Sequence, residues 1–66
     1  MKVVVNGNPQ AMPDGATVAD LVRAVTSVVR GVAVAVNGEV VPRSSWPAAR
    51  LRDGDRVEVL TAAQGG

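Results

Sequence analysis

The chain has 66 residues, a length that makes one small domain. Its hydrophobic content of 47% fits a folded domain, and its formal net charge of +1 argues against nucleic acid or a membrane as a partner. The absence of cysteine and histidine excludes disulfides and thiolate nucleophiles and removes the commonest general base and metal ligand, so neither a self-contained enzyme nor a metal site is expected.

The N-terminal segment has the pattern of a β-hairpin. Residues 2–6 are rich in valine and alternate in polarity, which predicts a strand. Asn6-Gly7 is a strong signal for a two-residue turn, because both central positions of that turn need a positive φ. Residues 9–12 are expected to return as a second strand at a sheet edge, since Pro9 has no N–H to donate.

A helix is predicted over residues 18–29. Thr17 is suited to cap it, and Asp20 completes a capping-box pattern three residues later. Arg30 suits the negative end of the helix, and Gly31 is expected to stop it in the left-handed conformation. Apolar residues at helical spacing form one stripe, namely Val18, Leu21, Val22, Val25 and Val29.

A second hairpin is predicted after the helix. Valine alternates with alanine over residues 32–36, which is strand spacing. Asn37-Gly38 then repeats the turn signal, and residues 39–41 are expected to return as a strand.

The last part of the chain contains a short helical turn and a final strand. Ser44 or Ser45 is expected to cap the helical turn, which carries Trp46. The Asp-Gly-Asp sequence at 53–55 predicts a tight turn, and residues 56–60 alternate as a strand.

These elements predict an α+β fold in which a mixed sheet of four to five strands packs on one helix. The last strand is expected to lie beside the first and parallel to it. Residues 1–60 then form the domain, and residues 61–66 form a flexible C-terminal tail. The expected core consists of Val3, Val5, Val18, Leu21, Val22, Val25, Val34, Val36, Val57 and Val59.

The tail ends in Gly65-Gly66, which presents a free α-carboxylate on a slim stem. Glycine has no Cβ, so this end fits a channel where any side chain would clash. Fully extended, residues 61–66 reach roughly 20 Å. Small residues also gather at termini that have no function. Because the chain has no thiol and no imidazole, the terminal carboxylate is the strongest candidate for a reactive group.

Period-2 alternation also assigns an outer face to the sheet. If Val3 and Val57 point toward the helix, the residues next to them point outward, and several of those are apolar. Contiguous exposed apolar side chains often mark an interaction site, so this face is expected to contact partner proteins. The partner-facing residues are Val4, Ala35 and Leu60, with Ala33 and Glu58 beside them.

Two other features have a simple structural explanation. Trp46 is expected to fill core volume, as a lone tryptophan in a small domain usually does, rather than to mark a partner surface. The arginines in the second half are interleaved with acidic residues and are expected to form a solvated face; they are Arg43, Arg50, Arg52 and Arg56.

Four stretches of the sequence resemble one known family. They are Val-Ala-Val-Asn-Gly at 34–38, Val-Val-Pro-Arg at 40–43 followed by Trp46, the segment 51–59 around Asp-Gly-Asp, and Ala-Gln-Gly-Gly at 63–66. With the length and the order of elements, they resemble the ThiS family, the sulfur carriers of bacterial thiamine biosynthesis, which have the ubiquitin-like β-grasp fold. The Val-Pro-Arg-x-x-Trp stretch and the Gly-Gly end are the most specific parts.

The resemblance implies a carrier and not an enzyme. In this family an E1-like adenylating enzyme uses ATP to adenylate the C-terminal glycine, here Gly66, and sulfur from a cysteine desulfurase system converts the adenylate to a thiocarboxylate. Thiazole synthase then takes the sulfur to build the thiazole ring. Gln64 and Gly65 correspond to the tail that enters the partner active sites. The resemblance implies no cofactor bound to the chain itself.

Three other assignments remain open from the residues. The small subunit of molybdopterin synthase uses the same chemistry with a different acceptor, but it is usually longer and has more aromatic residues near its start. A sulfur carrier for another pathway, such as cysteine synthesis or protein conjugation, is a second alternative, and a plain β-grasp binding module is a third. Residues 1–15 lack the basic start and apolar core of a signal peptide, so a cytoplasmic protein is expected. The free protein is expected to be a monomer.

Overall fold

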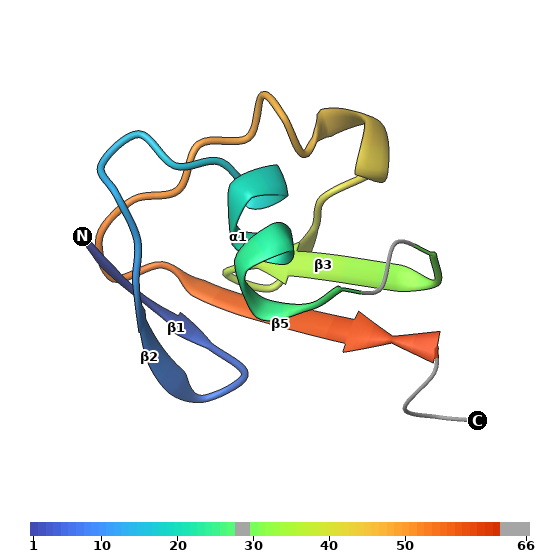
Figure 1. The fold of residues 1–66 in the computed structure, drawn as a ribbon, viewed down its shortest axis with the longest axis horizontal. Coiled ribbons are helices and arrows are strands. Elements are labelled where there is room, and N and C mark those ends of the chain that lie inside the picture. The colour runs from blue at the N-terminus through green and yellow to red at the C-terminus, as the bar shows by residue number, and fades with distance from the viewer. Residues whose placement is uncertain (28–29, 63–66) are drawn as a thin grey trace.

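The computed structural model describes residues 1–27 and 30–62. Within these ranges, five strands form one mixed sheet in the order β2-β1-β5-β3-β4, and helix α1 lies across one face of it (Figure 1). The predicted α+β fold, with one helix on a mixed sheet, is confirmed. The elements are β1 (Lys2–Val5), β2 (Asn8–Ala11), α1 (Val18–Val25), β3 (Val32–Val36), β4 (Glu39–Val40), the 3₁₀ turn η1 (Arg43–Ser45) and β5 (Arg56–Thr61).

Strand β5 occupies the centre of the sheet, between β1 and β3. It runs parallel to β1, with Val57 opposite Val5, which confirms the predicted pairing of the first and last strands. It runs antiparallel to β3, with Thr61 opposite Val32. Strand β5 extends one residue beyond the predicted end, and its last residue, Thr61, is still paired with β3.

Both Asn-Gly pairs form the predicted tight turns. Asn6 has φ 50° and Asn37 has φ 51°, and the glycine that follows each has φ 84°. Positive φ at both central positions gives the turn a twist that matches the twist of the flanking strands. Asparagine accepts this conformation better than most residues, so the two hairpins are set by local sequence.

Pro9 faces the free edge of the sheet, as predicted. The Met12 N–H donates to the Met1 carbonyl at 2.9 Å, and along an antiparallel pair only alternate residues bond to the partner strand. Pro9 lies three positions before Met12, which is an odd number, so its backbone nitrogen faces the open edge of β2 and not β1. The missing N–H therefore removes no bond there, and it discourages pairing with another chain.

Helix α1 begins with the predicted capping box. The Thr17 hydroxyl accepts from the Asp20 N–H at 3.3 Å, and the Asp20 carboxylate accepts from the Thr17 N–H at 2.9 Å. The backbone hydrogen bond from Thr17, then its hydroxyl and the Arg23 guanidinium, lower the pKa of Asp20 below its ordinary value. The ionised Asp20 carboxylate therefore stabilises the folded state at pH values above its unfolded pKa. This contribution to folding stability is lost as the pH falls through the lower pKa of Asp20 in the folded state.

The helix is shorter than predicted, and the predicted stop at Gly31 is wrong. Helix α1 ends at Val25, and Thr26 caps it with extended backbone (φ −148°, ψ 147°) while its N–H donates to the Val22 carbonyl at 3.0 Å. Val25 is 37% exposed, so no burial rewards another turn, and adjacent β-branched residues have low helix propensity. Val29, the last predicted member of the apolar stripe, lies outside the described residues.

Gly31 instead serves a close approach beside the end of β5. Its φ is +66°, and its carbonyl accepts the Ala62 N–H at 2.7 Å. A Cβ added at Gly31 would lie 2.8 Å from the Ala62 Cβ, which is a clash. Glycine is therefore required here by contact and by backbone conformation, and not by a helix terminus.

The core lies between α1 and the sheet. Of the predicted core valines, Val25 is exposed and Val36 is only partly buried. The core also contains three residues that were not predicted to be buried, namely Met12, Ala16 and Leu51. The buried hydrophobic residues among those described are Val3, Val5, Met12, Ala16, Val18, Leu21, Val22, Val34, Trp46, Leu51, Val57 and Val59.

Trp46 is part of this core, as predicted. It is 7% exposed, and its indole N–H donates to the Val41 carbonyl at 2.9 Å. The predicted serine cap of the helical turn is wrong, because η1 begins after Pro42 with no capping side-chain bond. Proline fixes its own φ and so directs the chain into this turn without a cap.

No helix in the ranges 1–27 and 30–62 is long and apolar enough to cross a membrane.

Candidate functional site

The site predicted from the sequence lies beyond the end of β5. The described chain is held as far as Ala62, whose N–H donates to the Gly31 carbonyl at 2.7 Å. The predicted tail residues Gln64, Gly65 and Gly66 lie outside the described residues. What the structure defines is therefore the position from which the tail departs, at the end of the central strand (Figure 1).

An asparagine side chain supports this end of β5 from the β1 side. The Asn6 N–H donates to the Val57 carbonyl at 2.9 Å. One pair further along, the Asn6 side chain accepts from the Val59 N–H at 2.9 Å and donates to the Val59 carbonyl at 3.0 Å. Asn6 was predicted only as a turn residue, because nothing in the local sequence indicates a partner 53 positions away.

The outer face of the sheet carries the residues predicted to meet partners. Leu60 is 62% exposed, and Val4 and Ala35 on the neighbouring strands are half-buried. The predicted alternation is confirmed, because Val57 and Val59 on the same strand are buried toward α1. The neighbours Ala33 and Glu58 are exposed, also as predicted.

Leu60 stands between two shallow hollows of this outer face. One of about 630 Å³ is lined by Val4, Asn6, Gly7, Arg56, Val57, Glu58 and Leu60. The other, of about 110 Å³, is lined by Ala33, Val34, Ala35, Val40, Glu58 and Leu60. Val40, 76% exposed, extends the apolar surface and was not predicted to be part of it. Its register opposite Ala35 on β4 was the available signal.

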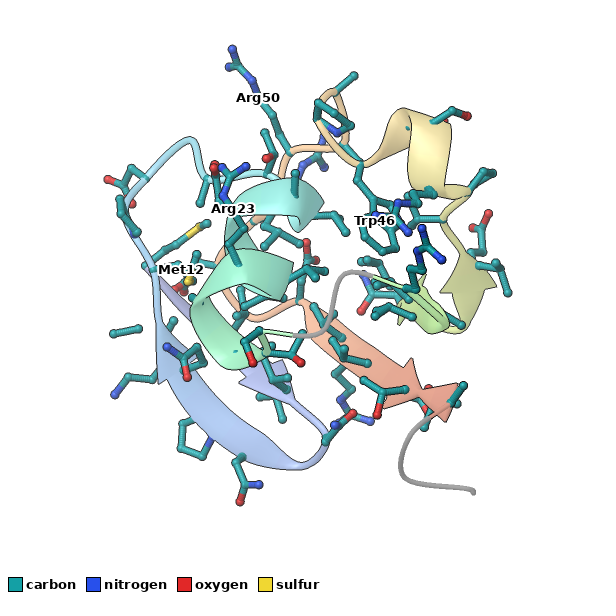
Figure 2. All side chains as sticks on the ribbon, turned by 45° about the vertical axis from the view of Figure 1, so that its right-hand side comes forward. Met12, Arg23, Trp46 and Arg50 are labelled. Carbon is teal, nitrogen blue, oxygen red and sulfur yellow. The ribbon has the colours of Figure 1, made fainter. Side chains whose placement is uncertain are left out.

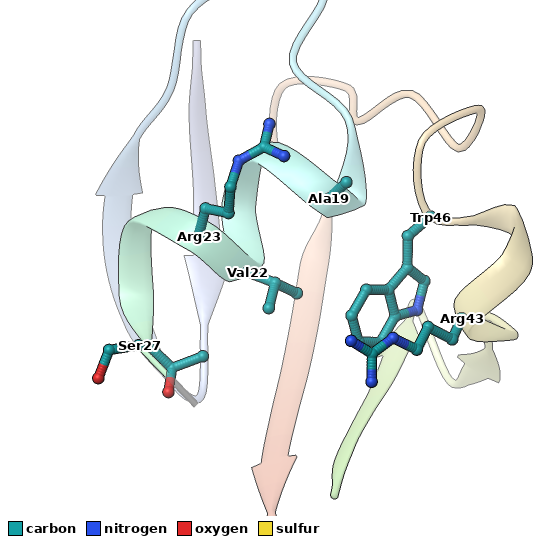
Figure 3. A pocket seen from close by; sticks show the side chains of 7 residues that line it. Ala19, Val22, Arg23, Ser27, Arg43 and Trp46 are labelled. Carbon is teal, nitrogen blue, oxygen red and sulfur yellow. The ribbon is translucent and has the colours of Figure 1, made fainter. Parts of the chain in front are cut away.

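A separate groove of about 410 Å³ lies on the helix side of the molecule (Figure 3). The Arg43 guanidinium lies over the Trp46 ring, 5.5 Å from its centroid, and Arg23 is bonded to Asp20 at 2.6 Å. Among the described residues, no carboxylate lines the groove. Its lining residues are Ala19, Val22, Arg23, Thr26, Ser27, Arg43 and Trp46.

The carboxylates of the Asp-Gly-Asp turn are used structurally. Asp53 accepts from the Lys2 N–H at 2.8 Å, and Asp55 accepts from the Arg52 N–H at 2.8 Å and from the Asn37 side chain at 3.0 Å. The nearby arginines are exposed, and Arg50 projects away from the body of the protein (Figure 2). No cluster of metal-ligating side chains is present in the described part of the chain.

Comparison with known proteins decides the assignment. The model of the ThiS family matches residues 3–66, which is nearly the whole chain. The chain belongs to the ThiS family. It is a sulfur carrier protein of thiamine biosynthesis and not itself an enzyme. ThiS proteins carry no bound cofactor, and ATP is used by the adenylating partner.

Individual relatives agree with this assignment. The sulfur carrier protein ThiS of Escherichia coli K12 is 29% identical over 66 residues, which are all of both chains. A thiazole synthase of Paramagnetospirillum magneticum is 36% identical over 66 residues, and this chain spans 20% of that protein's length.

Solved ThiS structures have the same fold. The crystal structure of ThiS from Geobacter metallireducens has a TM-score of 0.82 and 34% identity, with 92% of this chain and 93% of that chain covered. The solution structure of a thiamine biosynthesis protein from the same organism gives a TM-score of 0.75 at 36% identity, covering 91% and 81% of the two chains.

Proposed function

We propose that Gly66 is the residue on which this carrier holds sulfur. A sulfur carrier with no cysteine has no side-chain thiol for its cargo, and this observation carries the proposal. The family match continues to residue 66, so it includes the Gly-Gly end. An α-carboxyl group has a pKa of about 3.5, so it is ionised and nucleophilic at neutral pH.

The proposed reaction has two steps, both at the terminal carboxylate. First, a carboxylate oxygen of Gly66 bonds to the α-phosphorus of ATP and pyrophosphate leaves. Second, sulfur attacks the acyl carbon and AMP leaves. With hydrosulfide the product is the thiocarboxylate itself, whereas a persulfide gives an acyl disulfide whose S–S bond a thiol then cleaves. Adenylation comes first because a free carboxylate is a poor electrophile.

Three partners follow from this chemistry. An E1-like adenylating enzyme activates the tail, a cysteine desulfurase system supplies the sulfur, and thiazole synthase accepts it. The thiazole synthase relative supports the last of these, because a fifth of its length matches this whole chain. Gln64 and Gly65 would form the slim segment that enters the partner active sites. We place the reaction in the cytoplasm.

The sulfur-carrying residue can be tested by intact mass. After incubation with an adenylating enzyme, ATP and a sulfide source, the protein is expected to gain about 16 Da, because one carboxylate oxygen is replaced by sulfur. Tandem mass spectrometry should place the gain on Gly66, and a reaction without ATP is the control. A gain on any other residue, or none with any adenylating enzyme, contradicts the proposal.

We also propose that the partner enzymes dock on the outer face of the sheet. Leu60 is exposed, lies between the two hollows and is followed directly by the last residue of β5. An enzyme that covers Leu60 would therefore hold the point from which the tail departs. Val4 and Ala35 continue the same surface on the two neighbouring strands.

Leu60→Asp is expected to lower kcat/KM for adenylation by about tenfold or more, because it replaces the exposed apolar side chain of the proposed contact with a charge. Its circular dichroism spectrum and melting temperature should stay close to wild type, since the side chain is 62% exposed. Ala48→Asp, at an exposed turn position outside the outer face, is the matched control. Unchanged adenylation by Leu60→Asp would remove this face as the docking surface.

A further inference from the structure

Two asparagine side chains hold β5, one near each end. Asn37 accepts from the N–H of Arg56, the first residue of β5, at 3.0 Å. Asn6 bonds both backbone groups of Val59, near the other end. The two asparagines have nearly the same φ, 50° and 51°, and both precede glycine in a hairpin turn. They differ in which end of the central strand they support.

The contact at Val59 substitutes for a missing strand. Strand β1 pairs with β5 only as far as Val5 opposite Val57, and the Asn6 N–H makes the last backbone bond, to the Val57 carbonyl. Alternate residues of a strand direct their N–H and C=O to the same neighbour, so those of Val59 point to the side that β1 has left. A carboxamide offers one acceptor and a donor, as a peptide group does, and it satisfies both.

We propose that Asn6 is a positioning residue for the carrier reaction, which rests on the proposed function of Gly66. Its amide fixes the backbone of Val59, next to Leu60 on the docking face and two residues before the end of β5. On the other side of the strand, β3 continues its pairing to Thr61. Together these contacts fix the last residues of β5, the point from which the tail continues. A misplacement of about 1 Å at a reacting group can cost on the order of a hundredfold in rate.

Asn6→Gly and Asn37→Gly form a matched pair for the test. Glycine accepts a φ near 50° without strain, so each variant removes the side-chain bonds and leaves the turn conformation available. Each asparagine makes two such bonds, part-buried for Asn6 and exposed for Asn37, so the loss of melting temperature is expected to be larger for Asn6→Gly. The activities are therefore compared well below both melting temperatures. Asn6→Asp is a second variant at the site, because it keeps the acceptor for the Val59 N–H but has no N–H for the Val59 carbonyl.

The readouts are pyrophosphate exchange with an adenylating enzyme and amide hydrogen exchange. Asn6→Gly is expected to lower kcat about tenfold with a smaller change in KM, because Leu60, Val4 and Ala35 of the docking face are retained while the tail is misdirected. Asn6→Asp should also lower kcat, whereas Asn37→Gly should stay within about twofold of wild type. The Val59 amide should exchange faster in Asn6→Gly and not in Asn37→Gly.

Equal losses of kcat in Asn6→Gly and Asn37→Gly would show a general effect of stability and overturn the proposal. Wild-type kcat in either folded Asn6 variant would also overturn it, even if the Val59 amide exchanged faster. Failure of the wild type itself to be adenylated would instead contradict the proposed function of Gly66. The two failures are therefore distinguishable.

Discussion

Deletion of Gly65 and Gly66 is expected to abolish sulfur loading completely and to leave the melting temperature almost unchanged. The reason is that the reactive end and the core occupy different parts of the chain, since none of the buried core residues among those described lies beyond Val59. The last backbone bond described is that of Ala62 to Gly31. A thermal melt beside the mass assay for thiocarboxylate measures both quantities on one sample.

A point variant tests the same site without shortening the chain. Gly66→Ala keeps a terminal carboxylate of similar pKa but adds a methyl group beside the reacting carbon. In a channel shaped for glycine this methyl is expected to lower pyrophosphate exchange on the order of a hundredfold. Exchange as fast as wild type would mean that the channel does not require glycine.

For the variant that lacks Gly65 and Gly66, a fall of more than about 5 °C in the melting temperature would show that the tail is structural.

Leu21→Ala is expected to cost about 2–5 kcal/mol of unfolding free energy, because it leaves a cavity between the helix and the sheet. Leu21 is 0% exposed and is among the largest fully buried side chains of the described residues. A domain of this size has a total stability on the order of 3–10 kcal/mol. A substantial fraction of the variant is therefore expected to be unfolded. Urea unfolding curves measure the loss from the midpoint and slope.

Val25→Ala is the control for the Leu21 prediction. It removes an apolar side chain from the same helix at a position that is 37% exposed, and it is expected to cost less than about 1 kcal/mol. A loss below about 1 kcal/mol for Leu21→Ala would show that the helix–sheet core tolerates the cavity, contrary to its complete burial.

The elements that could be predicted from the sequence are those determined by neighbouring residues. Each Asn-Gly turn needs only two positive φ values, and the capping box needs only Thr17 and Asp20. The end of α1 could not be predicted in the same way. It depends on whether another turn would be buried, and Val25 is already exposed where the pattern predicted a core position.

Non-local contacts explain the rest of the difference. Ala16 and Leu51 lie outside the strands and the helix, so no period of 2 or 3.6 marks them as core residues. Met12 lies in the predicted strand 9–12 but one residue past the end of β2, and it was not assigned to the core. The outer face followed from alternation along single strands and was predicted in part. To place Val40 on this face, the register between β3 and β4 must be known. To predict the hydrogen bonds between Asn6 and Val59, the parallel pairing of β1 with β5 must be known.

The central position of β5 also has a consequence for how the protein folds. The contact between Asn6 and Val59 spans 53 positions of the chain, and β1 has no parallel neighbour in the sheet until β5 is present. Such long-range pairing carries a large loop-closure entropy, so folding is expected to be slow for a domain of this size. The sheet is complete only when β5, the strand that adjoins the tail, has paired with both β1 and β3. A nascent chain that ends before β5 would thus lack both a closed core and a tail to present to an enzyme.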